Sequence, residues 1–368
     1  MLFRSHDRRV GGGVGRPLGG GQGGGGSGAA HLVASYNHIP EGRHPRLRTL
    51  RSPAALPSPH AMQALLDTIA RMPLPTDGAQ RVFHGRGGLH PGEESWTLDW
   101  FAPVWLLTRF EPASDEELAA VGQALAARWS TLAPGQALNW VFQERDEVRA
   151  TNRLMAGAVP EPHLVEEAGA RYQLHLLRGQ NHGLFLDMAE GRRWVREWAA
   201  AAPGGRVLNL FAYTCAFSVA AMQGGAARVD NYDMARGALA IGKHNHALNG
   251  VDQGVGFLPH DIFNSWGRIA RHGPYELVVM DPPSYQKGSF VATKDYARLV
   301  RRLPDLLVPG GHALLCLNSP KLGEAFLREV VAAEVPGYEV LGRLPNPPAF
   351  ADADPDRALK VLLLRRPG

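Results

Sequence analysis

Four strand-like segments in the second half of the chain carry a carboxylate or an amide close to their carboxyl ends. The first segment, 206–213, contains Asn209, and the next three end at Asp233, Asp261 and Asp281. In an open α/β sheet, ligands lie beyond the carboxyl ends of the parallel strands. Oxygen atoms gathered at that edge can accept hydrogen bonds from the hydroxyls, amino group and ammonium of a nucleoside-bearing ligand. Helix capping explains one such aspartate, but it does not explain an acceptor at four successive strands.

Asp281 is followed by two prolines, Pro282 and Pro283, directly after the strand-like segment 276–280. Proline cannot continue a strand ladder, and it holds the residue before it extended. The strand must therefore stop, and the Asp281 carboxylate and the Pro282 carbonyl stand on a rigid loop. Such acceptors could hold a hydrogen-bond donor of a substrate in a fixed orientation. Tyr285 could stack on a flat ring of that substrate.

The turn after the first of these segments argues against a dinucleotide cofactor. A dinucleotide site has the pattern G-x-G-x-x-G at this turn, so that backbone amides can approach the pyrophosphate. Residues 210–218, LFAYTCAFS, contain no glycine. A diphosphate would be hard to place here, whereas an adenosyl ligand without phosphates can be accommodated.

The strands that position these side chains alternate with helix-like segments from about residue 187. This alternation predicts a parallel sheet with helices on both faces. Five strand–helix steps are followed by two further strands, 338–344 and 358–366. We therefore expect an α/β fold with a seven-stranded, Rossmann-like sheet over 187–368, in which the last strand can insert antiparallel.

Residues 61–186 predict a smaller α+β domain before that sheet. Segment 114–129 opens with Ser-x-x-Glu, a capping box that marks the start of a helix. Aromatic residues such as Trp96 and Trp105 could stack on RNA bases, but strands of this composition usually line a core, so burial is the favoured interpretation. The glycine-rich segment 84–92 has no Lys-Ser/Thr after it, so we interpret it as a turn and not as a phosphate loop.

Positive charge is concentrated in the first 60 residues, which hold eight arginines against Asp7 and Glu41. The remaining chain has 31 basic and 33 acidic residues, a net charge of −2, so any RNA-binding surface must be a local patch. The glycine-rich segment 10–30 has almost nothing to bury, which predicts a disordered tail over 1–60. Two interpretations of this tail stay open: it could tether RNA, or it could be a dispensable segment before a start at Met62. The second is favoured.

Cysteine usage and hydropathy point to a soluble cytoplasmic protein. The two cysteines, Cys215 and Cys316, lie far apart in core-like segments and form neither a disulfide framework nor a metal-binding spacing. No apolar stretch approaches the ~18–20 residues that span a bilayer. The N-terminus has no apolar h-region of ~7–15 residues. We expect no metal and no membrane association.

Three quoted segments together resemble a known family: 207–250 (VLNLFAYTCAFSVAAMQGGAARVDNYDMARGALAIGKHNHALNG), DPPSY at 281–285, and LLVPGGHALLCLNSPK at 306–321. They are similar to the class I S-adenosylmethionine-dependent methyltransferases. The nearest branch is that of the bacterial 23S ribosomal RNA large-subunit methyltransferases (RlmI/RlmK-like). The resemblance covers roughly 137–366, including NHGLFLDMAEGRR at 181–193. It implies a methyltransferase domain, S-adenosylmethionine as cofactor and 23S rRNA as partner.

The resemblance also implies roles for individual residues of this chain. Four residues would wrap the methionine end of the cofactor: Asn209, Phe211, Tyr213 and Thr214. Four would hold its nucleoside end: Asp233 at the ribose, Met234 against the adenine, Asp261 near the adenine amino group, and Ile262 beside the ring. Asp281 would complete the cofactor site and also belongs to the neighbouring catalytic loop. The catalytic loop itself would consist of Asp281, Pro282, Pro283 and Tyr285.

Two departures from the family pattern bear on mechanism. Cys215 stands where the family often has glycine, which leaves less room near the cofactor carboxylate. Ser319 stands where the 5-methylcytosine members carry a nucleophilic cysteine, and carbon methylation of a pyrimidine needs such a thiolate. Cys316 lies three residues earlier and should face the other side of its strand. Segment 317–321 is instead similar to the 7-methylguanine branch, which implies a purine nitrogen as acceptor.

Basic residues near the predicted site could contact phosphates, although each could equally belong to a solvated helix face. They are Arg192, Arg193, Arg196, Lys287, Lys294, Arg298, Arg301 and Arg302. HNH at 244–246 lacks the frame of a nuclease, and we expect it on the surface.

The sequence thus predicts an S-adenosylmethionine-dependent methyltransferase that acts on RNA, with a purine nitrogen as acceptor. Two alternatives stay open: a catalytically idle RNA-binding or assembly factor, and a methyltransferase for a protein or small molecule.

Overall fold

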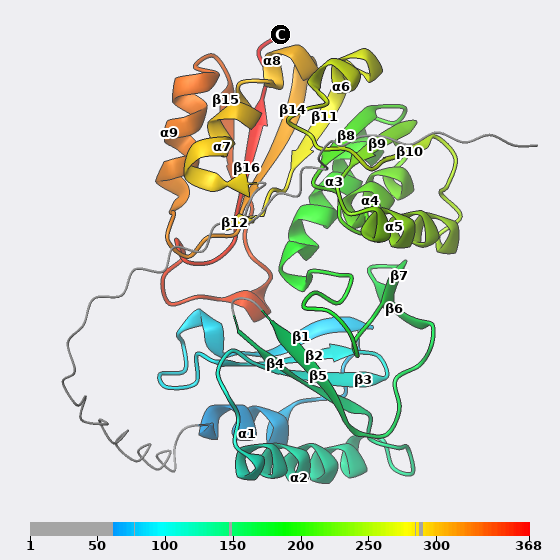
Figure 1. Ribbon diagram of the computed structural model, residues 1–368, viewed down its shortest axis with the longest axis vertical. Coiled ribbons are helices and arrows are strands. Elements are labelled where there is room, and N and C mark those ends of the chain that lie inside the picture. Colours follow the sequence, from blue (N-terminus) through cyan, green and yellow to red (C-terminus); the bar gives the residue numbers. More distant parts are fainter. Residues whose placement is uncertain (1–61, 77, 147–148, 284, 287–289) are drawn as a thin grey trace, which may run out of the picture. The chain divides into compact units, whose positions relative to one another are not determined.

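The computed structural model describes residues 62–76, 78–146, 149–283, 285–286 and 290–368 (Figure 1). The tail predicted over 1–60 lies outside these ranges. The predicted α/β fold is confirmed: a seven-stranded sheet is accompanied by a five-stranded sheet and two short two-stranded sheets. The predicted domain boundaries, at 60 and at 186, stay predictions.

The five-stranded sheet has the order β1-β2-β3-β4-β5. Its strands are β1 (Ala79–His84), β2 (Trp96–Phe101), β3 (Val104–Arg109), β4 (Trp140–Arg145) and β5 (Ala150–Ala156). Only β3 and β4 pair in parallel, because helix α2 (Asp115–Leu132) crosses over between them. The predicted capping box is present at the start of α2, where Ser114 and Glu117 exchange side-chain-to-backbone hydrogen bonds.

The two faces of this sheet bury different partners. Helices α1 (Gln63–Arg71) and α2 pack on one face over the tryptophans, and the rings of Trp100 and Trp105 lie 4.6 Å apart. The interpretation of these aromatic residues as core is therefore confirmed. The opposite face contacts the hairpin of β6 (His163–Glu167) and β7 (Ala170–Leu174) and the short helix η3 (Pro348–Phe350).

The seven-stranded sheet has the order β10-β9-β8-β11-β14-β16-β15. Its strands, in chain order, are β8 (Arg206–Leu210), β9 (Arg228–Tyr232), β10 (Val255–Leu258), β11 (Tyr275–Met280), β14 (Leu307–Leu317), β15 (Glu339–Arg343) and β16 (Lys360–Arg365). Strand β16 pairs antiparallel with both neighbours, as predicted. Strand order reverses between β8 and β11, which makes their carboxyl ends the switch point where ligands bind.

Helices cover both faces of the larger sheet (Figure 1). Three helices lie on one face: α3 (Ala189–Ala201), α4 (Ala216–Gly224) and α5 (Arg236–Leu248). Four lie on the other: α6 (Trp266–His272), α7 (Ala292–Val300), α8 (Leu303–Leu306) and α9 (Glu324–Glu334). Alternate residues of β11 enter the two cores, Leu277 and Val279 on the first face and Val278 and Met280 on the second. This double burial explains the uninterrupted apolar runs of the sequence.

Several predicted boundaries were wrong for local reasons. Strand β8 ends at Leu210, before the predicted residue 213, because Phe211 adopts a left-handed φ of 60°. The last two strands, predicted over 338–344 and 358–366, are shorter and span Glu339–Arg343 and Lys360–Arg365. The loop after Pro283 contains a small hairpin of β12 (Tyr285–Gln286) and β13 (Phe290–Val291).

Candidate functional site

The loop after β8 has an unusual backbone. Phe211, Tyr213 and Cys215 have left-handed φ values of 60°, 47° and 63°, and they alternate with Ala212 and Thr214, which do not. Each left-handed non-glycine residue costs about 1–3 kcal/mol, so the surrounding structure must impose the conformation. Alternating backbone of this kind turns successive N–H groups toward one concave side, which suits an anionic group such as a carboxylate.

Neighbouring segments hold this loop in place. The Thr214 hydroxyl donates to the Gly183 carbonyl at 2.5 Å, and the Asn245 amide donates to the Thr214 carbonyl at 3.0 Å. The same Asn245 accepts a hydrogen bond from the backbone N–H of Gln173 in β7. The loop is therefore clamped between helix α5, the β6–β7 hairpin and the segment that leads into α3.

The side chain of Cys215 packs against helix α5 at Gly242, which has no side chain of its own. Its side chain is fully buried, and a Cβ added at Gly242 would meet its sulfur at 2.4 Å. The thiol thus occupies the space that a side chain at 242 would take. We expected Cys215 to leave less room near the cofactor carboxylate, whereas its thiol packs against α5.

Two of the predicted carboxylates are fixed by local backbone donors. Asp233 accepts the N–H groups of Tyr213 and Ala235 at 2.8 and 2.7 Å, which joins the end of β9 to the loop after β8. Asp261 accepts the N–H of Phe263 at 2.8 Å and the side-chain amide of Asn264. Each carboxylate has about four lone-pair sites, so both can still accept bonds from a ligand.

The two apolar residues predicted at the adenine differ in exposure. Met234, next to Asp233, is 50% exposed, whereas Ile262, next to Asp261, is 3% exposed. An exposed methionine can cover a flat ring, and the buried isoleucine supports the wall behind it. Their roles stay predictions.

Asn209 is not brought together with the other predicted residues. Its side chain is buried, and its amide donates to Asn231 at 2.8 Å. Asn231 donates to Ser218, whose hydroxyl bonds His246, so the four residues form a buried polar network between the sheet and helices α4 and α5. The prediction of a surface HNH motif was wrong for Asn245 and His246, which are fully buried.

Asp281 stands at the end of β11, beside the end of β8. Its backbone N–H donates to the Leu210 carbonyl at 3.4 Å. Burial, followed by the nearby carboxyl of Asp187, raises the pKa of Asp281 to about 7. Burial also raises the pKa of Asp187, which belongs to the short helix η2 (Leu186–Met188). The negative charge of Asp187 therefore favours the protonated form of Asp281.

Asp187 was not predicted as a site residue, although it lies in segment 181–193, which resembles the family. The signal was available: an aspartate follows the apolar run 184–186 directly before a helix, as Asp281 follows β11. Nothing in the sequence, however, pairs these two carboxyl groups, which come from segments almost a hundred residues apart.

The remaining residues of the predicted catalytic loop are described in part. Pro282 is buried and Pro283 is half-buried after the end of β11. The backbone of Tyr285 pairs with Val291 in the β12–β13 hairpin. Stacking of Tyr285 on a base stays a prediction.

The end of β14 carries Asn318 and then Ser319, the position where the 5-methylcytosine members have a nucleophilic cysteine. Asn318 is exposed and lines a cavity, whereas the buried Ser319 hydroxyl accepts from the N–H of Lys321. Cys316 is fully buried, and burial together with the Asp281 and Asp187 carboxyls raises the pKa of its thiol. Cys215 is equally buried, and burial raises its pKa as well. Neither cysteine of this chain is poised as a thiolate.

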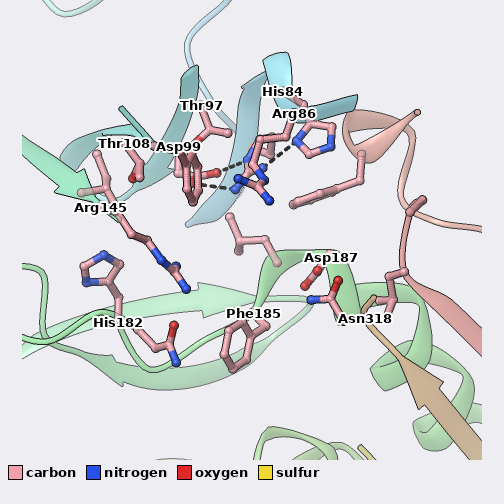
Figure 2. Close-up of a pocket in the computed structure, with 18 of the residues that line it drawn as sticks. His84, Arg86, Thr97, Asp99, Thr108, Arg145, His182, Phe185, Asp187 and Asn318 are labelled. Carbon is pink, nitrogen blue, oxygen red and sulfur yellow. Dashed lines mark hydrogen bonds and ion pairs between the residues drawn. The ribbon is translucent and has the colours of Figure 1, made fainter. Parts of the chain in front are cut away.

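Figure 2 shows the cavity, which has a volume of about 320 Å³. One wall is the polar end of the five-stranded sheet, with Arg86 and Arg145. The other wall carries Phe185, Asp187 and Asn318. The cavity therefore opens at the carboxyl end of β14 and is lined by one member of the carboxyl pair, Asp187.

Most of the basic residues singled out from the sequence have acidic partners. Arg192 is buried and forms two 2.6 Å hydrogen bonds with Glu167, so it stabilises the fold and does not face solvent. Four exposed arginines pair with carboxylates on their own or neighbouring helices: Arg193, Arg298, Arg301 and Arg302. Arg196 donates to the Ala168 carbonyl. Lys287 lies outside the described residues.

The arrangement suits the cofactor that the resemblance implies. Asp233 and Asp261 offer acceptors for hydroxyl and amino groups, although the N–H groups of Ala212, Tyr213 and Cys215 in the loop after β8 already donate to Tyr232, Asp233 and Ala212. Within the described ranges, no helix is long and apolar enough to cross a membrane, and no cluster of three metal-ligating side chains occurs.

Comparison with known proteins gives a consistent result. The family model described as S-adenosylmethionine-dependent methyltransferase matches residues 80–365. The chain is 26% identical over 242 residues to ribosomal RNA large subunit methyltransferase I of Aeromonas salmonicida, which covers 64% of this chain and 60% of that protein. It is 34% identical over 178 residues to ribosomal RNA large subunit methyltransferase K/L of a Psychrobacter strain, covering 46% of this chain and 21% of the relative.

The fold matches a solved structure as well. SMU.776, a proposed methyltransferase complexed with SAH, has a TM-score of 0.68 and 25% identity, covering 78% of this chain and 75% of that one. The chain thus spans about 60% of one curated relative and about a fifth of the other.

Proposed function

The chain belongs to the S-adenosylmethionine-dependent methyltransferase family, and from this premise we propose that it transfers a methyl group from S-adenosylmethionine to a purine nitrogen of RNA, with ribosomal RNA as the substrate. The bound cofactor supplies an electrophilic methyl group on a sulfonium. The choice of RNA is supported by the relatives, whose names are those of ribosomal RNA methyltransferases.

The observation that carries the choice of acceptor is the state of the two cysteines. Methylation of pyrimidine C5 requires a thiolate that adds to C6. This chain has two cysteines in all, both fully buried and both with a raised thiol pKa. A nitrogen acceptor needs no covalent step, because its lone pair attacks the methyl carbon directly.

The chain's own residues have distinct roles in this proposal. Phe211, Tyr213 and Thr214 form the loop that receives the amino-acid end of the cofactor. Asp233 and Asp261 bind its ribose and adenine, with Met234 and Ile262 on either side of the ring.

The substrate is aligned by the loop at the end of β11. In its ionised form, the Asp281 carboxylate accepts a hydrogen bond from the base, or the proton that an exocyclic amine loses. The Pro282 carbonyl is a second acceptor, Pro283 stiffens the loop, and Tyr285 stacks on the base. Asn209, buried behind the loop, acts as a positioning residue.

Transfer of radiolabelled methyl from S-adenosylmethionine to deproteinised ribosomal RNA tests this function. The RNA should come from a strain that lacks the gene, so that the acceptor position is unmodified. Label should appear in RNA and should be lost after ribonuclease treatment. RNA binding without transfer would identify an idle assembly factor, and full activity on RNA-free fractions would identify a protein or small-molecule methyltransferase.

A further inference from the structure

Four arginines line the cavity of Figure 2: Arg81, Arg86, Arg145 and Arg357. Arg86 belongs to the short helix η1 (Gly85–Gly87), and Arg145 is the last residue of β4. A third cavity arginine, Arg81, donates to both carboxylate oxygens of Asp99 at 2.6 and 3.1 Å. In the part of the chain that the structure describes, neither Arg86 nor Arg145 takes part in an ion pair.

Both unpaired guanidinium groups lie over the ring of Phe110. The guanidinium carbon of Arg86 is 4.0 Å from the ring centroid, and that of Arg145 is 5.6 Å away. An aromatic face stabilises a cation and leaves its N–H donors free. The two side chains are thus held in place with their donors available to a ligand.

The arginines of this wall repel one another, although the carboxylates of Asp99, Asp187 and Asp352 also line the cavity. Burial lowers the pKa of Arg86, and repulsion from Arg145, Arg81 and Arg357 lowers it further. The same positive charges act on His84. Burial, followed by the charges of Arg81 and Arg86, lowers its pKa to about 3. Like charges gathered in one cavity reduce stability, and an anionic ligand would relieve the repulsion.

The wall opposite Arg145 has the character of a base-binding surface. Phe185 is 39% exposed, and its ring lies 5.3 Å from that of Tyr213 in the loop after β8. Asp187 and Asn318 line the same wall, and a carboxyl and an amide are groups that can bond the edge of a base (Figure 2). The positive wall and the hydrogen-bonding wall face each other across a cavity of about 320 Å³. This volume lies in the usual range of about 300–1,000 Å³ for small-molecule sites, so it suits one nucleotide and excludes a duplex.

We propose that this cavity receives a single unpaired nucleotide of the RNA substrate, with its phosphate between Arg86 and Arg145 and its base against Phe185, Asp187 and Asn318. The inference rests on the proposed function and adds the site where the substrate is held. Arginine pairs bind phosphate oxygens through two parallel N–H bonds, which fixes both position and orientation. Phosphate contacts set the register of the RNA, while the base contacts select the nucleotide.

The segment 84–92, which we interpreted as a turn, supplies the key arginine. It remains a turn in the structure, but its glycines bring Arg86 to the cavity. A Cβ at Gly85 would meet the Glu93 carbonyl oxygen at 2.0 Å, and one at Gly87 would meet that of Ala351 at 2.2 Å. In this proposal the phosphate is bound by the Arg86 side chain and not by backbone N–H groups. The absence of a Lys-Ser/Thr pattern, which excludes a backbone phosphate loop, therefore says nothing about this contact.

The test compares two double variants that each remove two positive charges. Arg86→Gln/Arg145→Gln alters the cavity, and Arg193→Gln/Arg301→Gln alters exposed arginines that already have carboxylate partners. Affinity for deproteinised ribosomal RNA is measured between low and moderate salt, together with the KM for RNA in methyl transfer. Thermal stabilisation by S-adenosylhomocysteine checks that each variant keeps its fold and cofactor site.

We expect the cavity variant to bind RNA on the order of 10-fold more weakly per arginine, with a salt slope reduced by about one per lost phosphate contact. The control should bind almost as the wild type does, and Arg86→Lys/Arg145→Lys should recover part of the affinity. If the cavity variant keeps wild-type affinity, salt slope and KM, the inference is wrong while the proposed function stands. If the wild-type protein itself neither binds nor methylates RNA, the proposed function fails and the inference fails with it.

Discussion

The two halves of the carboxyl edge of the large sheet are built on different electrostatic principles. Beside β8, β9 and β10, the acidic groups are bound by donors of the protein itself, as Asp233 is by the N–H groups of Tyr213 and Ala235. Beside β11 and β14, acidic groups approach one another, and burial and the Asp187 carboxyl raise the pKa of Asp281 to about 7. The first half is thus fixed by backbone donors, whereas the second contains a buried carboxyl group whose pKa is raised.

This difference separates two tasks. A preformed half binds a cofactor of constant shape, and the clamped loop after β8 keeps its geometry at the cost of a left-handed backbone. A carboxyl group with a pKa of about 7, such as that of Asp281, can exchange a proton with a substrate near neutral pH. In the proposed function the β8–β10 half binds the cofactor and the β11–β14 half carries the chemistry, and each of the following variants tests that proposal.

Replacement of Asp281 should have the largest effect on activity. Asp281→Asn keeps the shape of the side chain but removes the ionisable acceptor, so methyl transfer should fall on the order of 10²-fold or more. Binding of S-adenosylhomocysteine, measured by calorimetry, should change little. Transfer at the wild-type rate would contradict a chemical role for this half of the edge.

The pH dependence of transfer should follow the carboxyl pair. Because the ionised form of Asp281 is the acceptor, kcat/KM should rise with pH through about 7 and fall about tenfold per pH unit below it. Asp187→Asn removes the neighbouring carboxyl, so the midpoint should move to lower pH. An unchanged midpoint in this variant would mean that the two groups are not coupled.

The same raised pKa has a consequence for stability. The folded pKa of about 7 lies above the ordinary value of 3.8, so folded Asp281 binds a proton more readily than unfolded Asp281. Its contribution to stability is present at low pH and is lost as pH rises from 3.8 toward about 7. Asp281→Asn should therefore melt at a higher temperature than the wild type at pH 8 and close to it at pH 4.

Replacement of Asp233 should affect the other half of the edge. Asp233→Asn loses a charged acceptor for hydroxyl groups, so affinity for S-adenosylhomocysteine should fall by about 10- to 100-fold. Affinity for RNA in a filter-binding assay should stay at the wild-type level. A loss of both affinities in a folded variant would show that the halves do not act separately.

The smallest effect is expected at the contact behind the loop after β8. In Gly242→Ala the new methyl group would lie 2.4 Å from the Cys215 sulfur, which should cost about 1–3 kcal/mol of unfolding free energy. Cys215→Gly removes that sulfur and also suits the left-handed φ of 63°. The double variant should recover most of the loss in denaturant unfolding, and additive losses would show that the two residues do not share this space.

The parts of this architecture that depend on local pattern could be predicted from the sequence. Strand–helix alternation gave the seven-stranded sheet, and the proline pair placed the end of β11 directly before Asp281. Features that depend on contacts between distant segments could not be predicted. Asp187 approaches Asp281 only after folding, and Arg86 meets Arg145 only because η1 and the end of β4 line one cavity.

Burial was the other source of error. From the sequence, Arg192 was a candidate for phosphate contact, but it pairs with Glu167 inside the protein. The HNH segment was expected on the surface, but His246 bonds Ser218 in the core. Polar residues on a helix can face the interior when a neighbouring element supplies partners. Such partners lie elsewhere in the chain and leave no trace in the local pattern.

The most direct measurement is mass spectrometry of nucleosides from ribosomal RNA incubated with S-adenosylmethionine and either the wild-type protein or Asp281→Asn. The account predicts one additional methylated purine, with the methyl on a nitrogen, in the wild-type sample and almost none with the variant. An additional 5-methylcytosine, or no new methylated nucleoside at all in the wild-type sample, would contradict it.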